Sequence, residues 1–285
     1  PSMLVSATYD NITRTAVLKF YEPTSQKLIL WHDETGHKPY CYSRLSPDEL
    51  DFLQERDDIL EIKTEKRHDL MKDEEVILSK IIVADPLTIG GTAGDKSIRN
   101  IIETWESDIK YYENYLYDRS LIVGKYYEIT DGKIKPHDLE ISDEVKLALK
   151  SLLWDKVDSE NMVDPKEFKE LISDWADLLN QPIPRIKRLS VDIEVEAEIG
   201  RIPDPKIAEK KVTAIGLKGT GGFDQIFVLR TEGTTEGTNE LDKNIKIVFY
   251  ELSKEKEMIL DAFKIIQEFP FVLTYNGDDF DLPYL

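Results

Sequence analysis

Two acidic side chains stand two positions apart inside an apolar stretch, SVDIEV, at residues 190–195. Such a stretch is typical of a β-strand, and alternation along a strand puts Asp192 and Glu194 on one face while their apolar neighbours point toward a core. Two carboxylates so close repel each other unless a cation lies between them. The pair therefore predicts a platform for Mg²⁺ or Mn²⁺, which prefer oxygen ligands.

The spacing of this pair is a weak signal by itself. Acidic residues number 56 in 285, so an acid-any-acid triplet occurs by chance roughly eleven times in a chain of this composition. Two features set this pair apart: it lies within an apolar run, and it falls on the first strand of a predicted α/β unit.

A third acid follows the last predicted strand, FVLTY at 271–275, within the closing stretch YNGDDFDLPYL. Asn276-Gly277 is typical of a turn, and Asp281 lies at a predicted helix start with Pro283 two residues on. One interpretation makes Asp281 a helix N-cap, worth about 1 kcal/mol. The other makes it a third carboxylate at the carboxyl end of a strand, where α/β sheets place ligands. The two roles are compatible.

The elements around these acids predict an α/β fold for the last hundred residues or so. Four strands are expected before the helix, in RLSVDIEV, KVTAIGLKG, QIFVLRT and IKIVFYEL. The helix is expected over 253–269, with Ser253 as its cap and one apolar face. FVLTY then returns the chain to the sheet.

The preceding sequence predicts a β-rich domain, so that the whole chain is α+β. A hairpin is expected from 15–22 and 27–33, a third strand at 38–45, and an amphipathic helix over 97–118. The glycine-rich stretch GGTAGDKS (90–97) resembles a phosphate loop, but Asp95 shifts the register of Lys96, so a turn is expected. Residues 131–186 predict a connector with two helices.

Composition limits the function classes. The net charge of −19 argues against a plain duplex-binding module. The single cysteine excludes a disulfide framework, and the four histidines lack zinc spacing and are expected at the surface or in turns.

No apolar run is long enough for a membrane span and no secretory signal is present, so a cytoplasmic location is expected. The high charged fraction fits a thermophilic source.

The combined motifs resemble those of family B DNA polymerases, particularly the archaeal replicative type. DIE at 192–194 and YNGDDFDLPYL resemble that family's first and second exonuclease motifs. TYD (8–10), HKPYCYSRL (37–45) and ESDIKYYENYLYDRSLI (106–122) resemble its N-terminal domain. The resemblance implies three parts: an N-terminal domain at 1–130 of the template- and uracil-sensing type, the connector at 131–186, and an incomplete ribonuclease-H-like 3′–5′ exonuclease domain at 187–285.

The resemblance also implies site residues. Asp192, Glu194 and Asp281 match the catalytic carboxylates, which bind two Mg²⁺ or Mn²⁺ ions. Asn276 and Phe280 match positions beside the substrate strand, and Val195 departs from the family's usual threonine. A further set matches a pocket that captures template uracil in archaeal relatives: Tyr9, Pro39, Tyr40 and Tyr111.

The function implied is two-metal hydrolysis of single-stranded 3′ ends, for proofreading during DNA replication, within a parent enzyme that copies a primer-template from dNTPs. The third exonuclease motif and the polymerase regions, including any contact with a sliding clamp, are expected beyond this chain. The fragment alone is therefore expected to lack activity. Two alternatives stay open: a non-catalytic module that binds nucleic acid or docks a partner, and a stand-alone nuclease.

Overall fold

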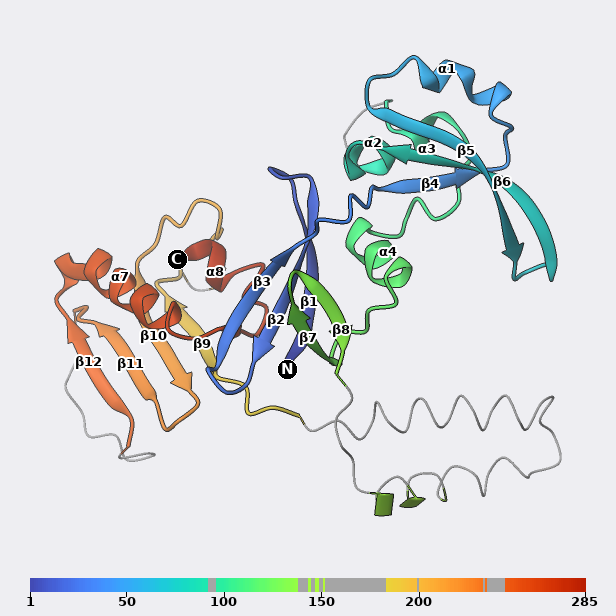
Figure 1. Cartoon of the computed structure of the whole chain (residues 1–285). Coiled ribbons are helices and arrows are strands. Elements are labelled where there is room, and N and C mark those ends of the chain that lie inside the picture. Colours follow the sequence, from blue (N-terminus) through green and yellow to red (C-terminus); the bar gives the residue numbers. More distant parts are fainter. Residues whose placement is uncertain are drawn as a thin grey trace. The chain divides into compact units, whose positions relative to one another are not determined.

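The computed structural model describes residues 1–91, 96–137, 143–144, 147–148, 151, 183–198, 200–232, 234 and 244–285. The chain divides into two compact units, one formed by Pro1–Glu22 with Leu28–Pro182 and the other by Pro23–Lys27 with Ile183–Leu285 (Figure 1). Most of the predicted connector at 131–186 lies outside the described residues, as do residues 92–95 of the glycine-rich stretch.

The first unit contains a five-stranded sheet in the order β3-β2-β1-β7-β8. Its strands are β1 (Ser2–Asp10), β2 (Thr15–Glu22), β3 (Lys27–His32), β7 (Tyr126–Thr130) and β8 (Lys133–Pro136). The predicted hairpin of β2 and β3 is confirmed, whereas β8 forms at the start of the segment predicted as a connector with two helices. Helix α4 (Tyr111–Asp118) contributes Tyr111 and Tyr115 to the core beneath this sheet.

A second, three-stranded sheet of the first unit has the order β4-β6-β5. Its strands are β4 (Tyr40–Ser43), β5 (Ile59–Asp69) and β6 (Glu74–Val83). Short helical segments pack against it around Cys41, Ile81 and Ile98: η1 (Asp48–Leu50), α1 (Asp51–Gln54), α2 (Pro86–Gly90) and α3 (Ile98–Ile101). The third predicted strand, at 38–45, is confirmed as β4.

The single helix predicted over 97–118 is wrong, because the chain is interrupted between α3 and α4. Trp105 and Tyr42 exchange two backbone hydrogen bonds, with N–O distances of 2.7 and 3.0 Å, which adds a β-bridge to β4. Glu106 has a positive φ of 59°, which no α-helix accommodates. Apolar residues at helical spacing therefore belong to two short helices and the loop between them.

The second unit is a five-stranded mixed sheet in the order β12-β11-β10-β9-β13. Its elements are β9 (Arg188–Val195), β10 (Val212–Gly219), β11 (Asp224–Leu229), β12 (Lys246–Tyr250), η2 (Leu252–Lys254), α7 (Glu255–Ile266), β13 (Phe271–Leu273) and α8 (Asp281–Tyr284). Strands β9, β10 and β11 are antiparallel, while β12 and β13 run parallel to their neighbours. The sheet and the order of its elements confirm the predicted α/β character.

Helix α7 covers one face of this sheet, where Met258 and Ala262 are fully buried against β9, β10 and β11 (Figure 1). Ser253 is not its cap, since the helix begins at Glu255 with Lys254 in the N-cap position. The first helical residue, Glu255, instead accepts a hydrogen bond of 2.8 Å from the backbone N–H of Val212. This contact fixes the start of the helix on β10. No helix among the described residues is long and apolar enough to cross a membrane.

Burial raises the pKa of three tyrosines of the first unit, Tyr40, Tyr111 and Tyr115, above the ordinary value of about 10. The carboxylates of Asp118 and Asp33 raise the pKa values of Tyr40 and Tyr115 further. A phenol whose pKa is higher in the folded state keeps a proton that the unfolded chain releases. Its stabilising contribution is complete below about pH 10 and is lost as the pH rises through the folded-state pKa.

We therefore expect the free energy of unfolding in urea to decrease as the pH rises above about 10. Tyr115→Phe has no proton to release at this position, so its free energy of unfolding should decrease less steeply with pH. The variant should be less stable than the wild type at neutral pH, because it lacks the 2.8 Å hydrogen bond to Asp33. Equal slopes for the two proteins would contradict this account.

Candidate functional site

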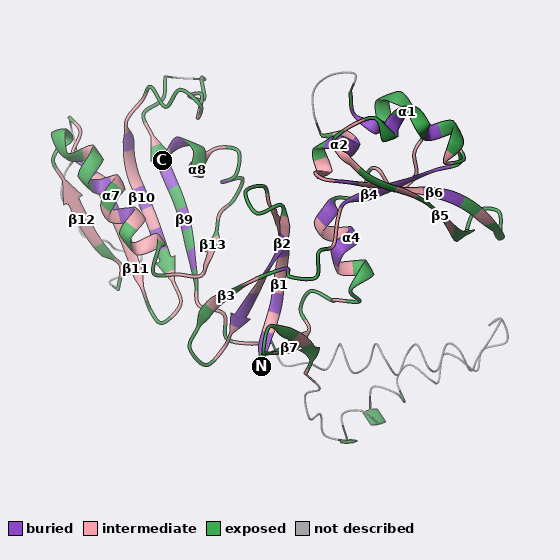
Figure 2. Cartoon of the chain, turned by 45° about the horizontal axis from the view of Figure 1, so that its top comes forward, coloured by how far each residue is buried: buried purple, intermediate pink, exposed green. Residues whose placement is uncertain are grey.

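Strand β9 shows the alternation that the sequence predicts. Leu189, Val191 and Ile193 are buried in the core beneath α7, whereas Asp192 and Glu194 are exposed (Figure 2). The two acids therefore share the face of the sheet that α7 does not cover. Burying the apolar side of β9 is what holds both carboxylates toward solvent.

The neighbouring strand leaves room beside both acids. On β10, Gly216 is paired with Asp192 and Ala214 is paired with Glu194. Directly paired residues of antiparallel strands project on the same face of the sheet. Because these neighbours are small, β10 places no large side chain directly beside either carboxylate.

The other edge of β9 is open at the same level. Strand β13 pairs with β9 only as far as Ser190. Beyond that point the backbone N–H of Ile193 donates a 3.1 Å hydrogen bond to Oδ1 of Asp281. Asp281 is only 4% exposed. Its carboxylate thus takes the place of a strand partner and lies at the backbone between the two exposed acids.

Asp281 is not a helix N-cap, contrary to one of the two sequence interpretations. Phe280 occupies the N-cap position of α8, and Asp281 is the first helical residue. Tyr284, at the end of the same helix, donates to the carbonyl of Lys210 at 2.8 Å and accepts from its N–H at 3.1 Å. These contacts anchor α8, so that the Asp281 side chain is held against β9.

The turn between β13 and α8 depends on two residues with special backbone requirements. Asn276 has a φ of +60°, which asparagine tolerates better than most residues, and its carbonyl accepts from the N–H groups of Asp279 and Phe280. A Cβ on Gly277 would lie 2.3 Å from the Thr274 side chain, so only glycine fits without a shift. The asparagine and glycine of the motif thus have a structural role in aiming Asp281.

The two residues predicted to lie beside a substrate strand differ in environment. Asn276 is exposed on the turn. Phe280 is partly buried, packs against the core of the sheet, and has its ring 5.4 Å from that of Tyr284 between centroids. Phe280 therefore helps to position α8 in addition to any contact with substrate.

The donor chemistry of this edge fits a hard cation. Asp192 and Glu194 offer exposed carboxylate oxygens, whereas one oxygen of Asp281 is engaged by Ile193. Among the described residues, no three His, Cys, Asp or Glu side chains are grouped closely enough to form a complete metal-binding set. Mg²⁺ commonly keeps several waters and uses only one or two carboxylates together with substrate phosphates, so a pair of acids is a sufficient protein platform for it.

A hollow of about 640 Å³ adjoins Asp192 on the exposed face of the sheet. Its lining includes Gly216 and Lys218 of β10 and Tyr275, which follows β13. These residues are not among the site residues that the sequence predicts. The one sequence signal was Gly216 itself, an isolated glycine inside a strand pattern, which is typical of close backbone approach or a ligand.

In the first unit, the four residues of the expected uracil pocket lie near the loop between β3 and β4. Tyr9 and Tyr111 pack edge to face with centroids 5.1 Å apart, and the Tyr111 hydroxyl donates to the carbonyl of His37 at 3.0 Å. Pro39 and Tyr40 are buried. The four side chains are thus held by packing and by hydrogen bonds within the unit.

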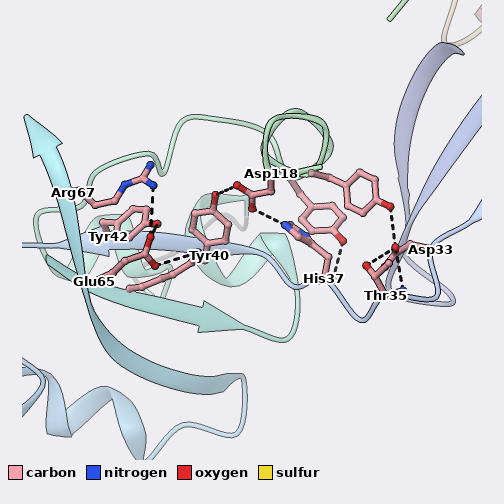
Figure 3. A network of polar contacts seen from close by, with 11 residues as sticks. Asp33, Thr35, His37, Tyr40, Tyr42, Glu65, Arg67 and Asp118 are labelled. Carbon is pink, nitrogen blue, oxygen red and sulfur yellow. Dashed lines mark hydrogen bonds and ion pairs between the residues drawn. The ribbon is translucent and has the colours of Figure 1, made fainter. Parts of the chain in front are cut away.

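His37 belongs to the same cluster and lies in the β3–β4 loop, where its side chain is 14% exposed. Its Nε2 lies 2.8 Å from Oδ2 of Asp118, whose Oδ1 accepts from the Tyr40 hydroxyl at 3.0 Å (Figure 3). A hollow of about 500 Å³ lies beside this group, and of the four predicted pocket residues only Tyr40 lines it.

Residues 102–285 match the family model described as DNA polymerase family B, exonuclease domain. This match covers more than half of the chain and includes the strand, turn and helix that position the three acids. The chain therefore belongs to the family B DNA polymerases, as the motif resemblance indicated.

Curated relatives extend over nearly the whole chain. DNA polymerase 1 of Saccharolobus solfataricus is 34% identical over 287 residues, and DNA polymerase 1 of Sulfolobus acidocaldarius is 32% identical over 287 residues. Each alignment covers 99% of this chain and 31% of the relative. The chain thus spans about a third of the length of these proteins.

A solved structure supports the same fold. The family B DNA polymerase from the hyperthermophilic archaeon Pyrobaculum calidifontis superposes with a TM-score of 0.58 at 14% sequence identity. The similarity covers 100% of this chain and 31% of that one. At this identity the comparison bears on the fold alone.

The bond between Asp281 and β9 can be tested by two substitutions. Asp281→Ala leaves the N–H of Ile193 without its partner, and we expect the free energy of unfolding in urea to decrease by about 1–3 kcal/mol. Asp281→Asn keeps an oxygen acceptor of the same shape, so its loss should be less than half as large. Equal losses for the two variants would contradict the role assigned to this hydrogen bond.

Proposed function

We propose that the second unit serves in 3′–5′ proofreading hydrolysis of single-stranded DNA ends, as part of a replicative family B DNA polymerase. The observation that supports this most is the hydrogen bond between Asp281 and Ile193, because it holds an acid from the second motif at the backbone between the two acids of the first. Asp192 and Glu194 are exposed opposite small residues, so a phosphodiester can approach them.

In this proposal, Asp192, Glu194 and Asp281 hold two Mg²⁺ or Mn²⁺ ions per site. When bound, these cations supply an activated water and neutralise the charge that develops on the phosphate. The buried face of β9 keeps the first two carboxylates fixed, and the helix contacts of Tyr284 keep Asp281 near them. Asn276 and Phe280 line the path of the substrate strand.

We further propose that the whole protein synthesises DNA from dNTPs on a primer-template in the cytoplasm, with a sliding clamp contacted outside this chain. The relatives that align over 99% of the chain are named DNA polymerases, which supports this proposal. The three-part division at 1–130, 131–186 and 187–285 belongs to the same proposal.

The affinity for a divalent cation distinguishes a nuclease site that binds metal from an acidic strand edge without catalytic function in a binding module. We expect Mn²⁺ affinity, measured by calorimetric titration, to decrease by at least about tenfold in Asp192→Ala, because the loss of a first ligand removes more than about 1.4 kcal/mol of binding. Glu209→Ala is a matched control, since Glu209 is an exposed acid of the β9–β10 loop.

The two variants distinguish Mn²⁺ binding at β9 from a general attraction of the cation to an acidic protein. Glu209→Ala should bind Mn²⁺ as the wild type does. If both substitutions reduce the affinity equally, or if neither does, the cation does not bind at β9 and the nuclease proposal is refuted in favour of the binding module.

A second proposal concerns the first unit, where Tyr9, Pro39, Tyr40 and Tyr111 belong to a site for template uracil, with Tyr40 alone of the four lining the adjacent hollow. It is supported by the convergence of these residues near the β3–β4 loop, around the ring contact between Tyr9 and Tyr111. Binding of a uracil-containing single strand should exceed that of the thymine counterpart in fluorescence anisotropy. Tyr40→Ala should remove this difference, whereas a preference that persists in the variant would exclude Tyr40.

A further inference from the structure

Strand β10 contains a β-bulge opposite the acidic end of β9. The pairing register shifts between Val212 and Ala214, which makes Thr213 an extra residue on β10. Thr213 and Ala214 together lie opposite Glu194, the second acid of β9. Backbone pairing continues on both sides of the shift, so the bulge is an insertion within the ladder and not the end of the strand.

The bulge changes the side of the sheet on which Thr213 lies. Ala214 is paired with Glu194 and shares its face, so regular alternation would place both chain neighbours of Ala214 on the face that α7 covers. Ile215 follows this rule and is fully buried. Thr213 is only partly buried, because the extra residue interrupts the alternation.

Contacts on the helical side of the sheet hold the bulge in place. One carboxylate oxygen of Glu255, the first residue of α7, accepts from the N–H of Val212 at 2.8 Å. The other oxygen of Glu255 lies 3.2 Å from Nζ of Lys211. Val212 itself is buried. The backbone next to Thr213 is thus fixed, and its side chain is held beside Glu194.

The Thr213 hydroxyl has one proton, and the backbone of β9 takes it. Oγ1 donates to the carbonyl oxygen of Glu194 at 3.1 Å. A hydroxyl has a single O–H donor and two acceptor lone pairs, so Oγ1 can then act only as an acceptor. The ionised carboxylates of Asp192 and Glu194 are acceptors too. An acceptor beside acidic side chains needs a donor, and a water coordinated to a divalent cation is a strong one.

We propose that the Thr213 hydroxyl accepts a hydrogen bond from a water of the cation that Asp192 and Glu194 hold. The inference rests on the proposed nuclease function and adds a positioning residue that does not ligate the metal itself. Mg²⁺ keeps several of its waters when it binds to proteins, so contacts with those waters contribute to its affinity and orientation. The bulge of β10 exists, in this account, to bring a hydroxyl to the hydrated ion.

Calorimetric titration with Mn²⁺ tests the proposal. Thr213→Val keeps the branched shape without the hydroxyl, and we expect the Mn²⁺ affinity to decrease about tenfold, as when a group that contacts a metal's ligands is lost. Thr213→Ser keeps the hydroxyl and should bind Mn²⁺ as the wild type does. Thr8→Val is the matched control, because Oγ1 of Thr8 donates to the carbonyl of Val17 across β1 and β2 of the first unit, at 3.4 Å. It should leave the Mn²⁺ affinity unchanged.

Urea unfolding of the same variants separates this role from a purely structural one. Valine is β-branched and favours strands, whereas serine is not β-branched, so Thr213→Val should unfold at an equal or higher urea concentration than Thr213→Ser. The proposal therefore predicts that the variant that is at least as stable is the weaker binder of Mn²⁺. The inference is overturned if Thr213→Val binds as the wild type does, or if Thr213→Ser loses as much affinity as Thr213→Val.

Asp192→Ala in the same titration distinguishes failure of this inference from failure of the nuclease proposal. If Asp192→Ala loses Mn²⁺ affinity and Thr213→Val does not, the cation site stands without Thr213. If the Mn²⁺ affinity does not depend on Asp192, both proposals fail together.

Discussion

The arrangement of the second unit depends on how the edge of β9 is closed. A parallel neighbour covers this edge only up to Ser190, and an unpaired N–H beyond it would be costly to bury. The Asp281 carboxylate satisfies the N–H of Ile193 and simultaneously brings a charge to the base of the exposed acidic pair. One hydrogen bond thus satisfies the backbone N–H of Ile193 and holds Asp281 at the strand that carries Asp192 and Glu194.

Several local features position Asp281 for its hydrogen bond with Ile193. The fit of Gly277 against Thr274 and the positive φ of Asn276 set the direction of the turn, while Tyr284 ties the short helix α8 to Lys210. Helix α7 buries the opposite face of β9 and fixes the alternation of its side chains. The residues of this motif that are not acidic therefore act mainly by setting the position of Asp281. This explains why the family's second motif is longer than its single matched carboxylate.

The sequence predicted the parts of this site that follow from period and turn chemistry. The apolar alternation of β9 placed Asp192 and Glu194 correctly on one face, and Asn276-Gly277 marked the turn. It could not predict that Asp281 bonds to a strand edge instead of capping α8, because that depends on where β13 ends. Nor could it predict the break between α3 and α4, since the bridge between Trp105 and Tyr42 is a tertiary contact that overrides a helical pattern. The sequence could not identify Gly216 and Tyr275 as neighbours of Asp192, because it is the sheet that places all three around one hollow.

We propose that divalent cations bind at the carboxyl end of β9 in preference to the other acidic surfaces of this chain. Paramagnetic broadening of backbone amide signals by substoichiometric Mn²⁺ measures this directly. The account predicts that the amides of residues 191–195, Gly216 and Asp281 broaden first. Broadening that begins at other acidic surfaces, with these amides unaffected, would contradict it.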